Sequence, residues 1–147
     1  ILEATSTERK CQAMLVCNFL EVGASAITEP SPAGLTGSTL ENLGHAAAGE
    51  EHEWTDMYPA FAKVAREEGF KQVAAAFEAI SIAEKQHHKQ YQTLADNLEA
   101  GLVFKRNGKV VWRCRNCGYL HEGEAAPNVC PACLHPQAHF ELLGENW

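Results

Sequence analysis

Four cysteines near the end of the chain have the spacing of a metal site. They form two C-x-x-C pairs separated by twelve residues: Cys114, Cys117, Cys130 and Cys133. Each pair turns sharply enough for backbone amides to point at its sulfurs, and four thiolates close a tetrahedral cage. Zinc and iron both fit such a cage, so the spacing does not decide between them. In a chain with no convincing secretory signal the pattern favours a metal over disulfides, and it indicates a reducing compartment, the cytoplasm.

Three glutamates and a histidine form a second group of potential ligands. Glu50 and Glu53, like Glu84 and His87, are spaced i, i+3, which places both members of a pair on one helix face. Glu53 and Glu50 lie 16 and 19 residues before Gly69, and Glu84 and His87 lie 15 and 18 residues after it. At the helical rise per residue, both pairs lie roughly 25 Å from a turn at Gly69. Two antiparallel helices therefore bring the four side chains to one level.

A bound metal explains this second group better than buried salt bridges do. Three carboxylates facing one imidazole cannot neutralise each other, and burying them without a cation is costly. Helical bundles hold two iron or manganese ions with Glu-x-x-His and carboxylates from neighbouring helices. Oxygen and imidazole ligands suit iron, manganese or zinc. A redox relay beside such a site favours iron in the cysteine cage as well.

One hairpin offers too few ligands for two metals, and two sources could supply the rest. Residues 1–22 are weakly helical and contain Glu8-x-x-Cys11, which has the right spacing but a cysteine in place of a histidine. Alternatively, a second copy of the hairpin, related by a two-fold axis, supplies a whole second set. The second source predicts a homodimer or a larger assembly. It also covers an apolar surface that a lone hairpin leaves open, which contains Trp54, Met57, Phe61, Phe77 and Ile80.

Two long helices must position the second group of ligands. The first helix is predicted from Ser38, where Ser38 and Glu41 have capping-box spacing, to about Glu68, with a bend at Pro59. The second is predicted from about Phe70 to Glu99, and Gly69 and Gly101 end the two helices. Short strands are expected around the cysteine loops, at Val103, Lys109–Trp112, Tyr119–His121 and His139–Leu142.

The N-terminal part is less clearly patterned. Glu8, Cys11, Leu15, Phe19 and Val22 are expected on one face of a short helix, with Cys11 and Cys17 half-buried. The stretch from Gly23 to Gly37 is rich in Gly, Pro, Ser and Thr and is expected to be extended. His45, His52 and His88 fall outside the apolar stripes and are expected in solvent.

The composition excludes two classes of partner. Lys and Arg number 12 against 19 Asp and Glu, and the formal net charge of −7 argues against a nucleic-acid surface. No apolar run approaches the roughly 20 residues that a membrane-spanning helix needs. The length of 147 residues suits one domain or a domain with a small appendage.

From about Ile27 to Trp147 the chain resembles rubrerythrin. The residues that carry the resemblance are Pro32-Ala-Gly, Ala48-Gly-Glu50-Glu-His-Glu53-Trp-Thr-Asp-Met-Tyr58-Pro, Ile82-Ala-Glu84-Lys-Gln-His87, Cys114-Arg-Asn-Cys117-Gly-Tyr-Leu-His-Glu-Gly and Cys130-Pro-Ala-Cys133. The resemblance implies a mainly α chain, with a ferritin-like four-helix diiron domain over residues 1–101 and a small β rubredoxin-like domain over residues 102–147.

The same resemblance implies an activity, a cofactor and roles for single residues. It implies a peroxidase that reduces hydrogen peroxide to water and takes electrons from a reductase or a rubredoxin. The implied cofactor is iron, one ion on the four C-terminal cysteines and two on a site with Glu50, Glu53, Glu84 and His87 as ligands. Tyr58 is implied as a hydrogen-bond donor near those two irons.

The chain departs from the family at its front. The family's first helix, with one ligand glutamate, is absent, and the second should contain Glu-x-x-His, where this chain has Glu8-Arg-Lys-Cys11 or, in another register, Arg9-Lys-Cys-Gln12. The chain is then a fragment, or a short form completed by association. Two other functions stay open: an electron-transfer or metal-binding module with an inactive helical site, and iron oxidation and storage.

Overall fold

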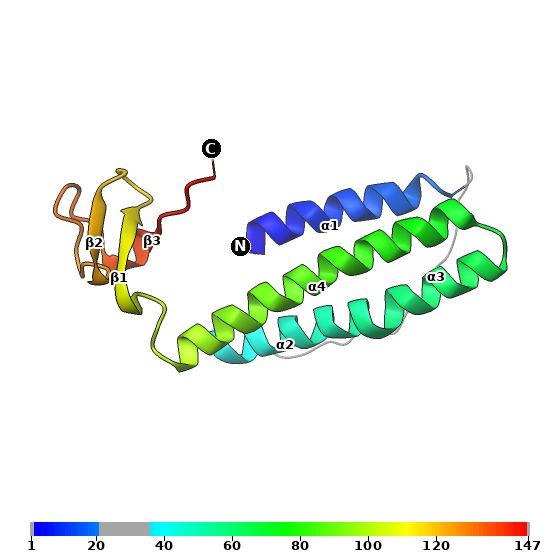
Figure 1. Cartoon of the computed structure of the whole chain (residues 1–147), viewed down its shortest axis with the longest axis horizontal. Helices are drawn as coiled ribbons and strands as arrows, with labels where there is room; N and C mark the ends of the chain where they lie inside the picture. The colour runs from blue at the N-terminus through cyan, green and yellow to red at the C-terminus, as the bar shows by residue number, and fades with distance from the viewer. Residues whose placement is uncertain (1, 21–35, 147) are drawn as a thin grey trace. The chain divides into compact units, whose positions relative to one another are not determined.

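The computed structural model describes residues 2–20 and 36–146, with side chains from Thr5 onward. The chain divides into two compact units, Ile1–Ala95 and Asp96–Trp147. The first unit is helical and the second contains a small antiparallel sheet (Figure 1). This confirms the predicted class of a mainly α chain with a small β part. Most of the segment expected to be extended, Gly23 to Gly37, lies outside the described residues.

The predicted helical hairpin is present. Its first arm comprises α2 (Thr39–His52), a five-residue π-helix (Glu53–Met57) and α3 (Tyr58–Glu67), and its second arm is α4 (Lys71–Glu99). The capping box forms, since the Glu41 amide donates to the Ser38 hydroxyl and the Ser38 amide donates to the Glu41 carboxylate. Gly69 ends the first arm with φ of +89° and Gly101 follows the second with φ of +65°.

The first arm is irregular beside Pro59, where the sequence predicts a bend. The π-helix lies just before this proline, and within it the Tyr58 amide donates to the Glu53 carbonyl, five residues back. Pro59 lacks an amide hydrogen, so it can donate no helical bond and suits the start of α3. Ser81 of α4 donates its hydroxyl to the Trp54 carbonyl at 3.1 Å. The hairpin's second arm therefore stabilises the widened turn that begins at Glu53.

Small residues line the contact between the two arms. Five alanines are buried there: Ala47, Ala62, Ala65, Ala74 and Ala95. The two arms pack side by side, and Glu50 of the first arm reaches Glu84 and His87 of the second. Ile80 is also buried, so the expectation that it is uncovered is wrong. Of the other residues expected to be uncovered, Phe61 is 40% exposed, whereas Trp54, Met57 and Phe77 are partly buried.

The third helix, α1 (Leu2–Cys17), lies along the hairpin, and Figure 1 shows it running in the same direction as α2 and α3. Its rotation differs from the prediction. Thr5 is buried and Arg9, Gln12 and Val16 are partly buried, whereas Cys11, Leu15, Phe19 and also Cys17 are exposed. The predicted face and the half-buried cysteines are therefore wrong. The face of α1 that is turned to the hairpin is mainly polar, and Glu8 and Arg9 form ion pairs with the hairpin from it.

The second unit is built on a three-stranded antiparallel sheet of order β2-β1-β3. The strands are β1 (Lys105–Cys114), β2 (Leu120–Ala125) and β3 (Phe140–Leu142), and a 3₁₀ turn (Gln137–His139) precedes β3. The expected strands are found, except that Val103 precedes β1. A small core supports the sheet: Trp112, Cys114, Ala126, Cys130 and Phe140. Among the described helices of the chain, none is long and apolar enough to cross a membrane.

Candidate metal centres

The four cysteines of the second unit converge. Their sulfurs lie within 4.8 Å of one another, with 3.7 Å from Cys114 to Cys133 and 3.6 Å from Cys117 to Cys130. A tetrahedral thiolate site with metal–sulfur bonds of about 2.3 Å has edges of about 3.8 Å, so the spacing fits one metal ion. All four side chains are free thiols without a disulfide. Cys114 and Cys130 are fully buried and Cys117 is exposed, so the cage opens to water on one side.

The knuckles present backbone amides to the sulfurs. Gly118 and Leu134 follow the second cysteine of each pair with φ of +81° and +59°, and each donates its amide to the carbonyl of the first cysteine. The amide of His135 is the main cause that lowers the pKa of Cys133 to about 5. The Tyr119 amide lowers the pKa of Cys117, but desolvation and the neighbouring sulfurs outweigh it and raise this pKa to about 12. Without a cation, the four sulfurs therefore resist becoming thiolates together.

Three of the four predicted ligands of the helical unit also converge. Ligand atoms of Glu50, Glu84 and His87 lie within 4.8 Å of one another, and all three residues are buried. The Nδ1 atom of His87 lies 2.6 Å from Glu84 Oε2 and 3.6 Å from Glu50 Oε2. The residues come from α2 and α4, at the same level of the hairpin, as the count from Gly69 predicted. Glu53 is not in this cluster, and both of its carboxylate oxygens bind Arg9.

The donor set of this cluster fits a metal ion. Oε2 of Glu50 and Oε1 of Glu84 are buried and have no hydrogen-bond partner among the described residues. An unpartnered buried oxygen of this kind costs about 1–3 kcal/mol, and more when it is charged. Burial is also the main cause that raises the pKa of Glu84, although the hydrogen bond with His87 lowers it. A cation between the two glutamates would remove both costs.

Two residues of α1 reach this cluster, so the predicted ligand source Glu8-x-x-Cys11 reaches it through Glu8 but not through Cys11. Glu8 Oε2 lies 2.8 Å from His87 Nε2. Arg9 lies 2.8 Å from both Glu50 Oε1 and Glu53 Oε2. Cys11, proposed as a substitute for a histidine ligand, is exposed and outside the cluster. The role of Arg9 was not predicted, because a positively charged residue in a weakly apolar helix is normally solvated. The sequence signal that could have revealed it is the excess of carboxylates that Arg9 faces.

Both ring nitrogens of His87 lie beside carboxylate oxygens. Nδ1 lies 2.6 Å from Glu84 Oε2 and Nε2 lies 2.8 Å from Glu8 Oε2. Burial lowers the pKa of His87, but hydrogen bonds to Glu8 and Glu84 outweigh it and the pKa is raised. The Glu8–His87 contact is typical of a metal ligand, whose second ring nitrogen donates to a carboxylate.

Tyr58 and His88 lie near the cluster. Burial, followed by the charges of Glu84 and Glu53, raises the pKa of Tyr58 to about 12, so its hydroxyl keeps its proton at neutral pH. His88 was expected in solvent, but its Nδ1 donates to the Ala47 carbonyl at 2.9 Å and its ring lies beside Trp54. It therefore supports the packing of α4 on α2. His45 and His52 are exposed as expected.

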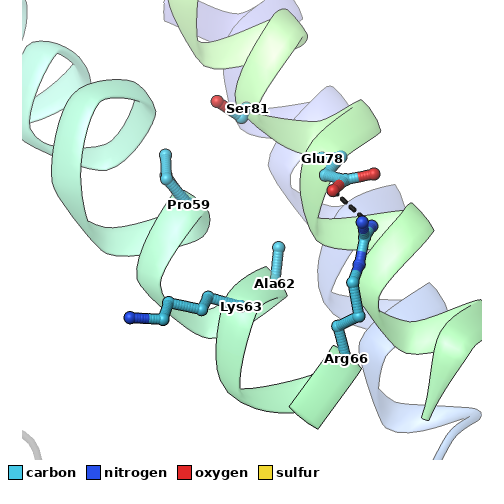
Figure 2. Close-up of a pocket in the computed structure, with 6 residues that line it drawn as sticks. All are labelled: Pro59, Ala62, Lys63, Arg66, Glu78 and Ser81. Atoms are coloured by element: carbon cyan, nitrogen blue, oxygen red, sulfur yellow. Dashed lines mark hydrogen bonds and ion pairs between the residues drawn. The ribbon is translucent and has the colours of Figure 1, made fainter. Parts of the chain in front are cut away.

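A separate pocket of about 360 Å³ lies between α3 and α4. Figure 2 shows its lining and the ion pair between Arg66 and Glu78 across it. Lys63 is the other charged side chain in the lining, and the pocket brings no cluster of potential metal ligands together among the described residues. The exposed Arg66–Glu78 pair is therefore a suitable control for substitutions of the buried charged residues.

Comparison with known proteins finds the same family over both units. The family model described as Rubrerythrin matches residues 15–95, and that of the rubrerythrin rubredoxin-like domain matches residues 112–141. Rubrerythrin of Nitratidesulfovibrio vulgaris is 49% identical over 147 residues, all of this chain and 77% of the relative. Rubrerythrin of Porphyromonas gingivalis is 50% identical over 143 residues, 97% of this chain and 72% of the relative.

A solved structure of nigerythrin in a mixed-valence state is 33% identical, with a TM-score of 0.47 over 89% of this chain and 60% of that one. The matched family models carry the expected ferritin-like and rubredoxin-like folds, and the cysteine cage and the glutamate–histidine cluster lie within the matched residues. The chain belongs to the rubrerythrin family, whose cofactor is iron, here with a four-cysteine site and a carboxylate–histidine site for it.

Proposed function

We propose that this chain is a non-haem iron peroxidase that reduces hydrogen peroxide to water. Each turnover adds two electrons and two protons to one peroxide molecule, breaks its O–O bond and gives two molecules of water. Electrons would enter at the four-cysteine centre from a reductase or a rubredoxin and pass to the carboxylate–histidine site. The domains are proposed as residues 1–101 and 102–147, and the compartment as the cytoplasm, which suits six unpaired cysteines.

The observation that carries the proposal is the buried cluster of Glu50, Glu84 and His87 in a chain that also has an open thiolate cage. Iron bound there would supply redox equivalents for O–O cleavage. Glu50, Glu84 and His87 would hold it, and Glu53 would join them when it is not bound to Arg9. The buried position keeps bulk water from the ligands.

The surroundings of the cluster can admit and orient a small polar substrate. A cavity of about 520 Å³ is lined by Arg9, Gln12, Met57, Tyr58, Phe61 and Phe77, among others. Most of this lining is apolar, and Arg9 and Tyr58 supply hydrogen-bond donors. Because the pKa of Tyr58 is about 12, its hydroxyl can donate a hydrogen bond to a peroxide oxygen without losing its proton.

The proposal is tested by whether peroxide reoxidises the reduced centre through the helical site. The protein should be red when purified in air, bleach with a reductant and regain its colour when peroxide is added. Changing Glu84 or His87 to Ala should abolish this return, while the red centre itself survives. Glu78→Gln, in the exposed pair of Figure 2, is the matched control and should behave as wild type. Full peroxide turnover in both site variants would refute the assignment.

An electron-transfer or metal-binding module is the alternative. The observation that favours it is Arg9, which binds two of the four predicted ligands, Glu50 and Glu53. Metal content separates the two functions. Three irons per chain support the peroxidase, whereas a single iron supports the module. If the protein is colourless with one bound zinc ion, and stays so after reconstitution with iron, electron transfer is excluded both for the peroxidase and for the module.

We also propose that a second chain completes the helical unit. Phe61, Val64 and Phe70 are exposed and, with Val16, Phe19 and Phe77, line an apolar groove of about 600 Å³. A second chain related by a two-fold axis would cover the groove and would add ligands to the site. Sedimentation of the metal-loaded protein should show a dimer or larger. A monodisperse monomer with two metals in the helical unit would refute this completion.

A further inference from the structure

The π-helix between α2 and α3 leaves one backbone carbonyl without a donor from its own helix. Within the π-helix the Tyr58 amide donates to the Glu53 carbonyl, five residues back instead of four. The next carbonyl, that of Trp54, takes its donor from residue 58 in an α-helix and from residue 59 in a π-helix. The Tyr58 amide already donates to Glu53, and Pro59 has no amide hydrogen. The Trp54 carbonyl therefore needs a donor from elsewhere.

Ser81 of the second arm supplies this donor. Its hydroxyl donates to the Trp54 carbonyl at 3.1 Å across the hairpin, in a partly buried position. Figure 2 shows the Ser81 hydroxyl directed from α4 toward the arm that carries Pro59, and both residues line the same pocket. In an α-helical register the Tyr58 amide would satisfy the Trp54 carbonyl and Ser81 would not be needed. The contact therefore favours the π-helical register, because it removes the cost of an unsatisfied carbonyl that this register creates.

The register decides which side chain lies on the face of the metal ligands. Glu53 begins the π-helix and Tyr58 follows its last residue. In an α-helix Met57, four residues after Glu53, would lie on the same face as Glu53, whereas a bond that spans five residues places Tyr58 there. The electrostatics agree with this placement, since burial, followed by the charges of Glu84 and Glu53, raises the pKa of Tyr58 to about 12. A return to the α-helical register would exchange a hydroxyl donor for the thioether of Met57.

We propose that Ser81 is a positioning residue that holds the π-helical register and so keeps the Tyr58 hydroxyl, rather than the Met57 side chain, on the face of the metal ligands. Its hydroxyl binds the backbone of the first arm, so it acts on the site through Tyr58. The inference rests on the proposed function for the use of Tyr58 as a hydrogen-bond donor to peroxide. The register itself does not depend on that function.

Nuclear magnetic resonance couplings across hydrogen bonds identify the carbonyl that accepts from the Tyr58 amide. The full chain carries zinc in the cysteine cage for this measurement, so that no paramagnetic iron broadens the signals. In the wild type the Tyr58 nitrogen should couple to the Glu53 carbonyl carbon. In Ser81→Ala it should couple to that of Trp54, whereas Ser81→Thr keeps the hydroxyl and should behave as wild type. Thr93→Val is the matched control and should change nothing, because the Thr93 hydroxyl donates to a carbonyl of its own helix.

Peroxide turnover by the iron-loaded protein gives a second readout. Ser81→Ala should lower kcat/KM for peroxide by about three- to tenfold, the range that corresponds to one ordinary hydrogen bond. Its iron content should stay at the wild-type value. In a Tyr58→Phe background the same substitution should change kcat/KM by less than about twofold, because the hydroxyl that Ser81 positions is absent.

The two measurements separate this inference from the proposed function. An unchanged coupling between Tyr58 and Glu53 in Ser81→Ala, or an equal loss of kcat/KM in both backgrounds, would overturn the inference and leave the peroxidase standing. If the couplings change as expected while the iron-loaded wild type does not turn over peroxide, the peroxidase fails and Ser81 still holds the register. A coupling of Tyr58 to the Trp54 carbonyl in the wild type would refute the register itself, whether or not Ser81→Ala folds.

Discussion

Replacing Glu84 by glutamine should stabilise the metal-free protein while it weakens metal binding. Glu84 is fully buried, Oε1 has no partner, and the charges of Glu50 and Glu53 face it. The amide of glutamine removes the buried charge, keeps an acceptor for His87 and adds N–H groups near the unpartnered Glu50 oxygen. Giving the unpartnered Glu50 oxygen a donor recovers about 1–3 kcal/mol, which is the cost of leaving a buried polar group unsatisfied. The expected change is therefore an increase in the free energy of unfolding.

The same substitution should reduce the stabilisation that a metal provides. A ligand present at 100 times its Kd stabilises the folded state by about 2.7 kcal/mol. A variant that binds the metal about 100-fold more weakly would gain only about 0.4 kcal/mol at the same concentration. The two effects have opposite signs, so they separate the cost of the buried carboxylate from its value as a ligand.

Thermal unfolding followed by far-ultraviolet circular dichroism measures both effects, because the helices dominate this signal. In a unit of this size each kcal/mol shifts Tm by about 4–8 °C. In chelator, Glu84→Gln should melt at least about 4 °C above wild type, and added metal should raise its Tm far less. Glu78→Gln, at the exposed pair with Arg66, should change stability by less than about 0.5 kcal/mol. A lower Tm for Glu84→Gln in chelator would show that the interaction between Glu84 and His87 alone offsets the free-energy cost of burying the carboxylate. The argument for a metal from that cost would then fail.

Three further predictions concern packing and the cysteine cage. Ala74→Leu should lower the free energy of unfolding by about 1–3 kcal/mol in denaturant titrations, because Ala74 is fully buried. Ala75 is exposed, so Ala75→Leu should not lower it, and equal effects of the two substitutions would refute the contact of the arms at Ala74. Gly118→Ala should lower the free energy of unfolding by about 1–2 kcal/mol, because Gly118 has φ of +81°, and it should lower the temperature at which the red colour is lost. An unchanged temperature would contradict this prediction. Cys117→Ser should abolish the normal colour but keep the helical signal, and loss of both would contradict independent units.

The two ligand groups could be predicted because their signals are local or periodic. The spacing of Cys114, Cys117, Cys130 and Cys133 is a property of two tight turns, and the structure brings these sulfurs together. The meeting of Glu50 with Glu84 and His87 follows from helix rise and from one turn at Gly69. Neither inference needed the tertiary packing, since a connection of three residues, Glu68 to Phe70, leaves the arms no alternative to lying side by side.

The rotation of α1 and the π-helix could not be predicted in this way. Apolar periodicity predicts the buried face of a helix only where burial of apolar surface drives the contact. The buried face of α1 contains Thr5, Arg9, Gln12 and Val16, of which only Val16 is apolar, so the apolar pattern pointed to the wrong face. Within the π-helix, the Trp54 carbonyl accepts a hydrogen bond from Ser81, 27 residues away. Such a contact leaves no periodic signal in either segment.

Counting charges explains both what the sequence left open and why Arg9 is suited to the site. Glu8, Glu50, Glu53 and Glu84 place four carboxyl groups around two basic side chains, Arg9 and His87. This excess of acidic groups is what the sequence left unexplained, because only the placement of α1 shows that Arg9 lies among them. Arg9 therefore holds together the carboxylates of Glu50 and Glu53, which would otherwise repel one another.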